Sequence, residues 1–310
     1  MKVMTYNVGQ WYIGNGSNVP STLDEDFYNL QNGIIERADA DILFINEYRD
    51  PFSSAGRTAK SVLSPYFPYI EARNKSSGYM GRAICSKYPL SNYITHNFTK
   101  GSASYYYDSA EITVGGKTVT LVVLHLMVNP EANRYLQAQE LCDYLKTLDS
   151  FIAGGDYNTG ISPDYGSDNV NSTAYAHYVK LFTDEGFHSA NYNTDGFLIT
   201  CNDGVDGTGE NWMIDNIITS SDISILSAYV DDAKLQDKMG VKTDHMPLIA
   251  DLLIEPKPYN FNNSFLFSTY QRFAGLSTDE KPTPQGNAVF LELDTAKVYY
   301  YKNGAWSILG

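Results

Sequence analysis

The sequence predicts a mixed α/β sandwich, and three observations lead to this prediction. Short β-rich runs recur over the first 255 residues. Several have apolar residues at both odd and even positions, as in strands covered on both faces. Two segments between these runs have apolar residues at helical spacing. Turn signals such as Val114-Gly115-Gly116-Lys117 indicate hairpins. Strands alternating with a few helices favour a mixed α/β architecture.

The expected elements can be given in chain order. In the helix from Asp24 to Ala38, the residues Ile34 and Ile35 lie on the apolar side, and the second helix runs from Pro130 to Leu148. Proline is well tolerated in the first turn of a helix, which fits Pro130. The expected strands are Val3 to Val8, Ile42 to Ile45, Arg82 to Ser86, Val119 to Val128, Phe151 to Ala153, Ile214 to Ser220 and Leu248 to Ile254.

The charge balance limits the classes of function. The chain of 310 residues contains 22 Lys and Arg against 36 Asp and Glu, a net charge of −14 at pH 7. A broadly basic nucleic-acid binder is disfavoured, because attraction to phosphate needs a positive face. A local basic site, or a phosphate site bridged by a metal ion, remains open. The three cysteines lack the paired spacing of a zinc site and are expected to be buried small hydrophobes.

A domain boundary is predicted where Glu255-Pro256-Lys257-Pro258 favours an extended linker. Residues 1–255 form the predicted main domain, and residues 256–310 a linker with a small β-rich module. Strand-like runs in this module are expected at 288–293, 297–301 and 306–309. The module is too short to bury a large core by itself, so we expect it to pack on the main domain or on a partner.

Acidic and amide residues recur at the ends of the predicted strands, followed by loop-forming residues. In a sandwich whose strands end at one rim, such residues converge on a cleft. Carboxylate oxygens there suit Mg²⁺ or Mn²⁺, which also accept water and phosphate. Each residue alone would be explained as a cap or turn residue, so the hypothesis depends on their joint pattern. The residues are Asn7, Glu47, Asp156, Asn158, Asp244 and His245.

Together these strings resemble the endonuclease/exonuclease/phosphatase superfamily of metal-dependent phosphodiesterases, which includes pancreatic-type deoxyribonucleases. In family order they are KVMTYNV, DILFINEY, GRAICSKYPL, LVVLHL, GGDYN, MIDNIITS and TDHMPL. The resemblance implies a four-layered α/β sandwich, two mixed sheets flanked by helices, with the small C-terminal β-rich appendage added to it. The chain departs from the family pattern at Asn46, where glutamine is usual, and at Arg82, where Asn or Asp is common.

The resemblance also implies roles for individual residues. Asp156 matches the residue that deprotonates the attacking water, and Asn158 the one that holds the phosphate and that water. His245 and His125 match the two active-site histidines, and Asp215 the acidic residue near the phosphate. A looser match makes Glu71 the carboxylate that orients His125. The implied metal ligands for Mg²⁺ or Mn²⁺ are Glu47, Asn7 and Asp244.

The segment FAGLSTDEKPTPQGNAVFLELDTAKVYYYKNGAW resembles short β modules near the ends of bacteriophage structural proteins. This resemblance implies a docking module, with other virion proteins as partners. An unrelated β-hairpin appendage is the competing interpretation. No signal peptide or membrane-spanning stretch is recognised, so we expect a soluble protein of the virion or the cytoplasm.

The leading hypothesis is therefore a magnesium-dependent hydrolase, a DNA endonuclease or exonuclease, that uses water activated by Asp156. A second hypothesis is a phosphatase or phosphodiesterase of a small or lipid phosphate on the same fold. A third, from another class, is a phage structural protein that retains the fold without catalysis.

Overall fold

The computed structural model describes most of the strands and helices and part of the loops. Contacts divide the chain into two compact units, residues 1–112 with 119–253, and residues 254–310 with 113–118. The predicted linker at 255–258 lies outside the described residues, so the domain boundary stays a prediction. The described residues are 1–9, 25–48, 58–73, 81–128, 130–158, 180–191, 198–202, 211–231, 245–254, 271–284, 288–292, 295, 297–302 and 305–308.

Two mixed sheets form the centre of the first unit. Sheet A has the order β13-β14-β1-β2-β4-β3, with β1 parallel to β2 and antiparallel to β14. Sheet B has the order β5-β6-β7-β8-β12-β9, with β8 parallel to β7 and antiparallel to β12. A short separate ladder pairs β10 with β11. The bounds are β1 Lys2–Asn7, β2 Ile42–Tyr48, β3 Tyr69–Arg73, β4 Gly81–Ser86, β5 Ser91–Asn97, β6 Tyr106–Val114, β7 Lys117–His125, β8 Phe151–Asp156, β9 His188–Ser189, β10 Cys201–Asn202, β11 Asn211–Trp212, β12 Asp215–Thr219, β13 Ile223–Val230 and β14 Leu248–Ile254.

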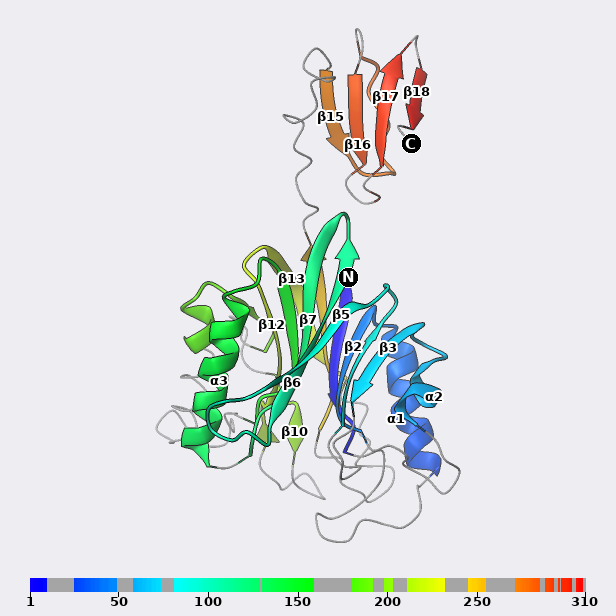
Figure 1. Ribbon diagram of the computed structural model, residues 1–310. Helices are drawn as coiled ribbons and strands as arrows, with labels where there is room; N and C mark the ends of the chain where they lie inside the picture. The colour runs from blue at the N-terminus through cyan, green and yellow to red at the C-terminus, as the bar shows by residue number, and fades with distance from the viewer. Residues whose placement is uncertain are drawn as a thin grey trace. The chain divides into compact units, whose positions relative to one another are not determined.

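Helices cover the outer face of each sheet (Figure 1). Helices α1 (Glu25–Ala38) and α2 (Ala59–Leu63) share one core cluster with Leu43 and Ile45 of sheet A. Helix α3 (Glu131–Leu145) packs on Leu124 and Ala153 of sheet B. The four layers confirm the predicted fold class. The short α2, which the sequence pattern did not predict, begins with a capping box from Thr58 to Ser61.

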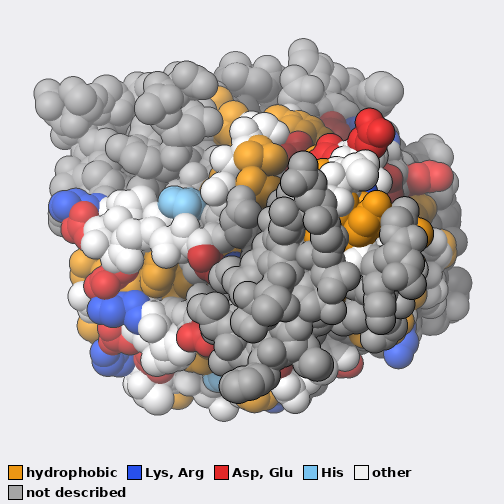
Figure 2. Space-filling view, turned by 90° about the horizontal axis from the view of Figure 1, so that it is seen from above, with side chains coloured by type: hydrophobic (Ala, Val, Ile, Leu, Met, Phe, Trp, Pro, Cys, Tyr) orange, Lys and Arg blue, Asp and Glu red, His pale blue; other side chains and the backbone are white. Residues whose placement is uncertain are grey.

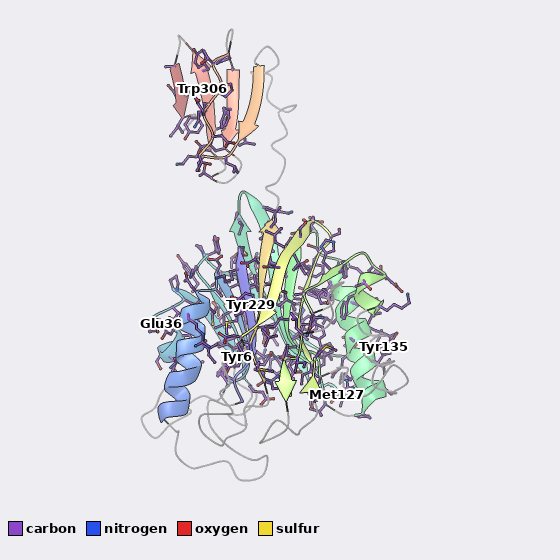
Figure 3. All side chains as sticks on the ribbon, turned by 180° about the vertical axis from the view of Figure 1, so that it is seen from behind. Tyr6, Glu36, Met127, Tyr135, Tyr229 and Trp306 are labelled. Atoms are coloured by element: carbon purple, nitrogen blue, oxygen red, sulfur yellow. The ribbon has the colours of Figure 1, made fainter. Side chains whose placement is uncertain are left out.

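Side-chain alternation decides which residues face the space between the sheets. Met4 and Tyr6 of β1 join the cluster under the helices, so Thr5 and Asn7 point the other way, toward sheet B. Val122 and Leu124 of β7 likewise join the cluster under α3, so His125 points toward sheet A. In Figure 3, Tyr6 lies in the interior, whereas Glu36 lies on the outer side of α1.

The close approach of the two sheets depends on a glycine in β8. A β-carbon built on Gly154 would lie 2.2 Å from the Phe44 ring of β2. Phe44 is fully buried, so the ring has little room to move away. Gly154 therefore makes the space into which the aromatic ring of the opposite sheet packs.

The second unit contains a four-stranded sheet. Its order is β15-β16-β17-β18, with only the first pair parallel. A Lys281–Glu292 ion pair of 2.8 Å supports it, and Trp306 packs on Phe290 and Tyr301. The unit fits the predicted β-rich appendage, whereas its docking role stays a prediction. The strands are β15 Gln271–Gly275, β16 Ala288–Glu292, β17 Val298–Lys302 and β18 Ala305–Ile308.

Among the described helices, none is long and apolar enough to cross a membrane. The described cysteines Cys85, Cys142 and Cys201 are buried and unbridged, as expected.

The packing at Gly154 generates a stability prediction. We expect Gly154→Ala to lower the free energy of unfolding by about 1–3 kcal/mol, because the added methyl group overpacks the contact with Phe44. Gly33→Ala in α1 is the control, because a β-carbon there meets nothing within 4 Å and alanine favours helix by up to about 1 kcal/mol. Urea unfolding of both variants measures the difference. Equal stability of Gly154→Ala and the wild type would contradict the proposed packing constraint.

Candidate active site

The polar residues predicted at strand ends meet at one edge of the sandwich. The parallel pairs place Asn7 beside Asn46 in sheet A, and His125 beside Asp156 in sheet B. Because β12 runs antiparallel to β8, its first residue, Asp215, lies opposite Asp156. The ends of four strands and the start of a fifth therefore deliver polar side chains to one place.

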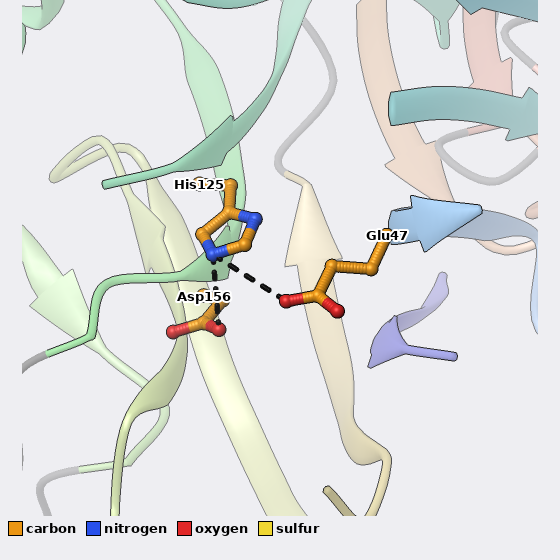
Figure 4. A group of neighbouring side chains, drawn as sticks. All are labelled: Glu47, His125 and Asp156. Carbon is orange, nitrogen blue, oxygen red and sulfur yellow. Dashed lines mark ion pairs between the residues drawn. The ribbon is translucent and has the colours of Figure 1, made fainter. Parts of the chain in front are cut away.

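Asp156 contacts several members of this group, and Figure 4 shows its ion pair with His125 beside that of Glu47. Its Oδ2 accepts a hydrogen bond from Asn7 Nδ2 at 3.1 Å and lies 3.5 Å from Nε2 of His125 and of His245. Its Oδ1 accepts the backbone N–H of Asn158 at 2.7 Å. The Asp156 side chain is only 2% exposed, so these partners replace water around the carboxylate.

Glu47 approaches Asp156 from sheet A by way of a bulge in β2. The ladder with β4 shifts between Asn46 and Tyr48, and Glu47 adopts a left-handed backbone with φ of 55°. Bulges next to active sites commonly redirect a side chain in this way. Glu47 Oε1 accepts from Asn7 Nδ2 at 3.1 Å and lies 3.8 Å from His125 Nε2. Its side chain is 21% exposed, which makes it the group that reaches solvent.

Asp215 binds the side of the His245 ring that faces away from Asp156: its Oδ2 lies 2.7 Å from the ring Nδ1. This contact leaves Nε2 facing Asn7 and Asp156. Thr200 positions the Asp215 backbone in turn, because its hydroxyl accepts the backbone N–H groups of Ile214 and Asp215. Thr200 also accepts the N–H of Met246 through its carbonyl, so one buried residue positions both partners.

The predicted site residues divide into three groups. Glu71 lies in β3, the outermost strand of sheet A, and its carboxylate forms no hydrogen bond or ion pair with any described residue, so the structure does not bring it to His125. Asp244 lies outside the described residues. The structure brings together the remainder, which are Asn7, Glu47, His125, Asp156, Asn158, Asp215 and His245.

The two asparagines differ in detail from their implied roles. Asn7 Oδ1 accepts the N–H of Gly9 at 3.1 Å, so the amide nitrogen, and not the oxygen, faces the carboxylates. Asn158 uses its side-chain amide to donate to Leu126 O at 2.8 Å and adopts a left-handed backbone with φ of 51°. In this arrangement both residues hold carboxylates in place.

Sequence reasoning did not assign a role to two residues that support the site. Asn46 was singled out only as a departure from the usual glutamine, yet it hydrogen-bonds the Asp156 backbone N–H. Thr200 carries no signal in the sequence, because a single threonine between loops resembles many others.

Comparison with known families identifies the fold. A family model described as "Endonuclease/Exonuclease/phosphatase family" matches residues 15–245 of the 310. The chain belongs to this family. A search of curated protein sequences returned no significant match.

Solved structures of the endonuclease/exonuclease/phosphatase fold superpose on most of the chain. An endonuclease/exonuclease/phosphatase from Beutenbergia cavernae is 13% identical and covers 99% of this chain and 80% of its own, with a TM-score of 0.59. The human Nocturnin catalytic domain, solved with bound sulfate, is 18% identical, with coverages of 82% and 94% and a TM-score of 0.58. An AP endonuclease from Archaeoglobus fulgidus is also 18% identical, with coverages of 82% and 100% and a TM-score of 0.58. At these identities the likeness establishes the fold.

Burial and crowding shift the pKa values of two central groups. Burial raises the pKa of Asp156 to about 8; His245 opposes this shift, while the carboxylates of Asp215 and Glu47 add to it. For His245, burial alone would lower the pKa, but Asp215, Cys201 and Asp156 together raise it well above its ordinary value. The surroundings, Asp215 above all, therefore favour the protonated, cationic form of the His245 ring.

Two overlapping groups of side chains could hold a metal ion. They are Glu47 with His125 and Asp156, and Asp156 with Asp215 and His245; within each group the ligand atoms lie within 4.8 Å of one another. Oxygen donors predominate, which suits a hard cation such as Mg²⁺ or Mn²⁺. The first group contains Glu47, the carboxylate that solvent reaches, and so it fits an exchangeable ion better.

The pairing of Asp215 with His245 generates a spectroscopic prediction. We expect Asp215→Asn to lower the pKa of His245, because the nearest negative charge is removed while the shape of the side chain is kept. Proton NMR titration of the histidine rings in metal-free protein measures the change. The exposed His188 of β9, at the edge of sheet B and bonded to Ile223 O of β13, supplies a reference ring signal in the same spectra. An unchanged His245 titration would contradict the ion pair.

Proposed function

We propose that this protein is a metal-dependent phosphodiester hydrolase that acts on DNA. The observation that carries the proposal is the convergence on Asp156 of two histidines and a second carboxylate, at the strand ends of a fold whose family is established. Hydrolysis of a phosphodiester needs an activated water, neutralisation of the phosphoryl oxygens and stabilisation of the leaving oxygen. The residues at this edge offer a group for each requirement.

Asp156 is the proposed general base. Its raised pKa brings the carboxyl group near the working pH, where a base is most effective. Asn7 and the Asn158 backbone hold the carboxylate by separate oxygens, so the side chain has one orientation toward the water. A proton taken by Oδ2 lies close to both histidine rings.

His245 is the proposed cation at the phosphoryl group. Asp215 holds Nδ1 and supports the positive charge of the ring, which leaves Nε2–H to donate to an anionic oxygen. His125, beside Glu47 and Asp156, is the proposed second donor.

Glu47 is the proposed metal ligand. Its carboxylate combines partial exposure with a backbone redirected toward Asp156, and a second oxygen donor lies beside it. A bound Mg²⁺ or Mn²⁺ would neutralise phosphoryl oxygens and stabilise the leaving oxygen. Asn7 would join the ligands only if its amide turned away from Gly9, and Asp244 remains a predicted ligand.

The charge distribution bears on the substrate. Figure 2 views the end at which β1 begins, opposite the site, and on that face the described Lys and Arg side chains lie beside acidic ones and form no broad basic patch. With a net charge of −14, attraction to DNA would be local to the site, through the metal and the histidine cation. Among the similar structures, one is an AP endonuclease, which supports DNA as the substrate class.

Replacement of Asp156 tests the catalytic role. We expect Asp156→Asn to reduce hydrolysis about 10²–10⁴-fold, because the amide keeps the shape but cannot accept the proton of water. Supercoiled plasmid, end-labelled linear DNA, a small phosphodiester and a phosphomonoester are the substrates to compare. The control is Asp251→Asn, since Asp251 lies opposite Lys2 at the other end of the sheet and its carboxylate accepts a hydrogen bond from the Ser227 hydroxyl.

The outcomes of this comparison separate the hypotheses. Cleavage of DNA by the wild type but not by Asp156→Asn supports the nuclease. Rapid turnover of a small phosphoester with undamaged DNA would favour the alternative substrate class on the same fold. Equal rates for the wild type and Asp156→Asn on every substrate would mean that the site does not catalyse hydrolysis.

Removal of the metal provides an independent test. We expect EDTA to abolish hydrolysis and excess Mg²⁺ or Mn²⁺ to restore it, because the carboxylates repel phosphate without a cation. Glu47→Gln should raise the metal concentration for half-maximal activity at least about tenfold, since it removes the ligand charge. Ca²⁺ and Zn²⁺ added after EDTA measure the selectivity. Full activity in EDTA would contradict the metal dependence.

A further inference from the structure

Asn46 connects the two sheets directly behind the site. It is fully buried at the last regular position of β2, immediately before the bulge that turns Glu47. Its side chain points toward sheet B, as does Phe44 two residues earlier. A buried amide needs partners for both its donor and its acceptor, and here both come from the opposite sheet.

The hydrogen bonds of this amide reach two strands of sheet B. Asn46 Nδ2 donates to Leu124 O of β7 at 2.7 Å, and Oδ1 accepts the backbone N–H of Asp156 in β8 at 3.1 Å. In sheet A, the Asn46 carbonyl accepts the N–H of Val8 at 3.1 Å. One residue therefore links the ends of β1, β2, β7 and β8.

Gly155, the residue before Asp156, leaves room for the hydrogen bond from Asn46 to Leu124 O. A β-carbon built on Gly155 would lie 2.0 Å from Leu124 O, the same oxygen to which Asn46 donates. Any side chain there would displace the carbonyl or the strand. The two glycines of the GGD string thus have separate purposes, since Gly154 admits the Phe44 ring and Gly155 leaves room at the carbonyl that Asn46 binds.

We propose that Asn46 is a positioning residue that sets the separation of the Glu47 and Asp156 carboxylates, and thereby the metal affinity and the turnover of the site. The proposal rests on the proposed function. Asn46 is joined to Glu47 by a peptide bond and to the Asp156 backbone by a hydrogen bond, so the two carboxylates belong to different sheets but share one anchor. Removal of a group that orients metal ligands in this way commonly lowers metal affinity or activity by about 10- to 100-fold.

The test compares Asn46→Leu with a matched control, Ser220→Ala. Ser220 also hydrogen-bonds the β8 backbone, but at Phe151 N, the end of the strand remote from Asp156. We expect Asn46→Leu to weaken Mn²⁺ binding at least about tenfold by calorimetric titration, and to lower kcat by a similar factor with KM within about threefold. For Ser220→Ala we expect both values within about twofold of the wild type; a lower melting temperature of either variant does not affect this comparison.

If the Asn46→Leu variant does not fold, Asn46→Ser replaces it in the same measurements. The smaller side chain leaves room for water to hydrogen-bond Leu124 O and Asp156 N, so these buried groups keep hydrogen-bond partners. The same loss of Mn²⁺ affinity is expected, and the Asp156 amide should exchange with deuterium faster than in the wild type.

Each outcome has a distinct meaning. Folded Asn46 variants that bind Mn²⁺ and turn over substrate like the Ser220→Ala control would overturn the positioning role and leave the proposed function intact. A wild type that binds no Mn²⁺ and cleaves no phosphoester would overturn the proposed function itself.

Discussion

Phe44 packs over Gly154, and this contact brings β2 and β8 together closely enough for their polar ends to meet. The site residues belong to both sheets. Asn7 and Glu47 come from sheet A, whereas His125, Asp156 and Asp215 come from sheet B. If the sheets were farther apart, Asn7 could not donate to Glu47 and Asp156 at once, as it does with two distances of 3.1 Å. The apolar packing between the sheets is thus what sets the distances between charged groups at their edge.

Charge at this edge is balanced by neighbours rather than by solvent. Three carboxylates, those of Glu47, Asp156 and Asp215, lie in a space that water reaches mainly at the first of them. Burial penalises ionisation most, the neighbouring carboxylates add to this penalty, and the pKa of Asp156 is raised to about 8 as a result. The negative charges of Asp215 and Asp156 also raise the pKa of His245, against the opposite effect of burial. A divalent cation beside Glu47 would relieve the repulsion, which is the electrostatic reason that metal binding and base function belong together here.

The sequence permits prediction of the buried part of the fold better than of its edges. The helix expected from Asp24 coincides with α1 to within one residue, and the apolar runs correspond to the central strands, because burial on both faces leaves a continuous apolar signal. Edge strands β3 and β13 were not predicted, since their mixed exposure removes that signal. In the site, the side chains of His125 and Asp215, which the resemblance implied, lie with the gathered residues, whereas Glu71 rested on a loose match and lies in the outermost strand. Contacts such as Asn46 with Asp156, which depend on how two sheets face each other, carry no local pattern.

Two of the four described non-glycine residues with left-handed backbones lie at the same edge as the charge. Glu47 and Asn158 both have left-handed backbones, a conformation that raises the energy of a residue with a β-carbon by about 1–2 kcal/mol. Neither residue would keep that geometry in a free loop, where the chain relaxes to ordinary values. Glu47 keeps it because β2 pairs with β4 on both sides of the bulge. Asn158 keeps it because its backbone N–H is bonded to Asp156 and its side chain to Leu126 O. The strands therefore hold the carboxylate of Glu47 and the support of Asp156 in orientations that the local sequence disfavours, and the stability that maintains them comes from the packed layers behind the site.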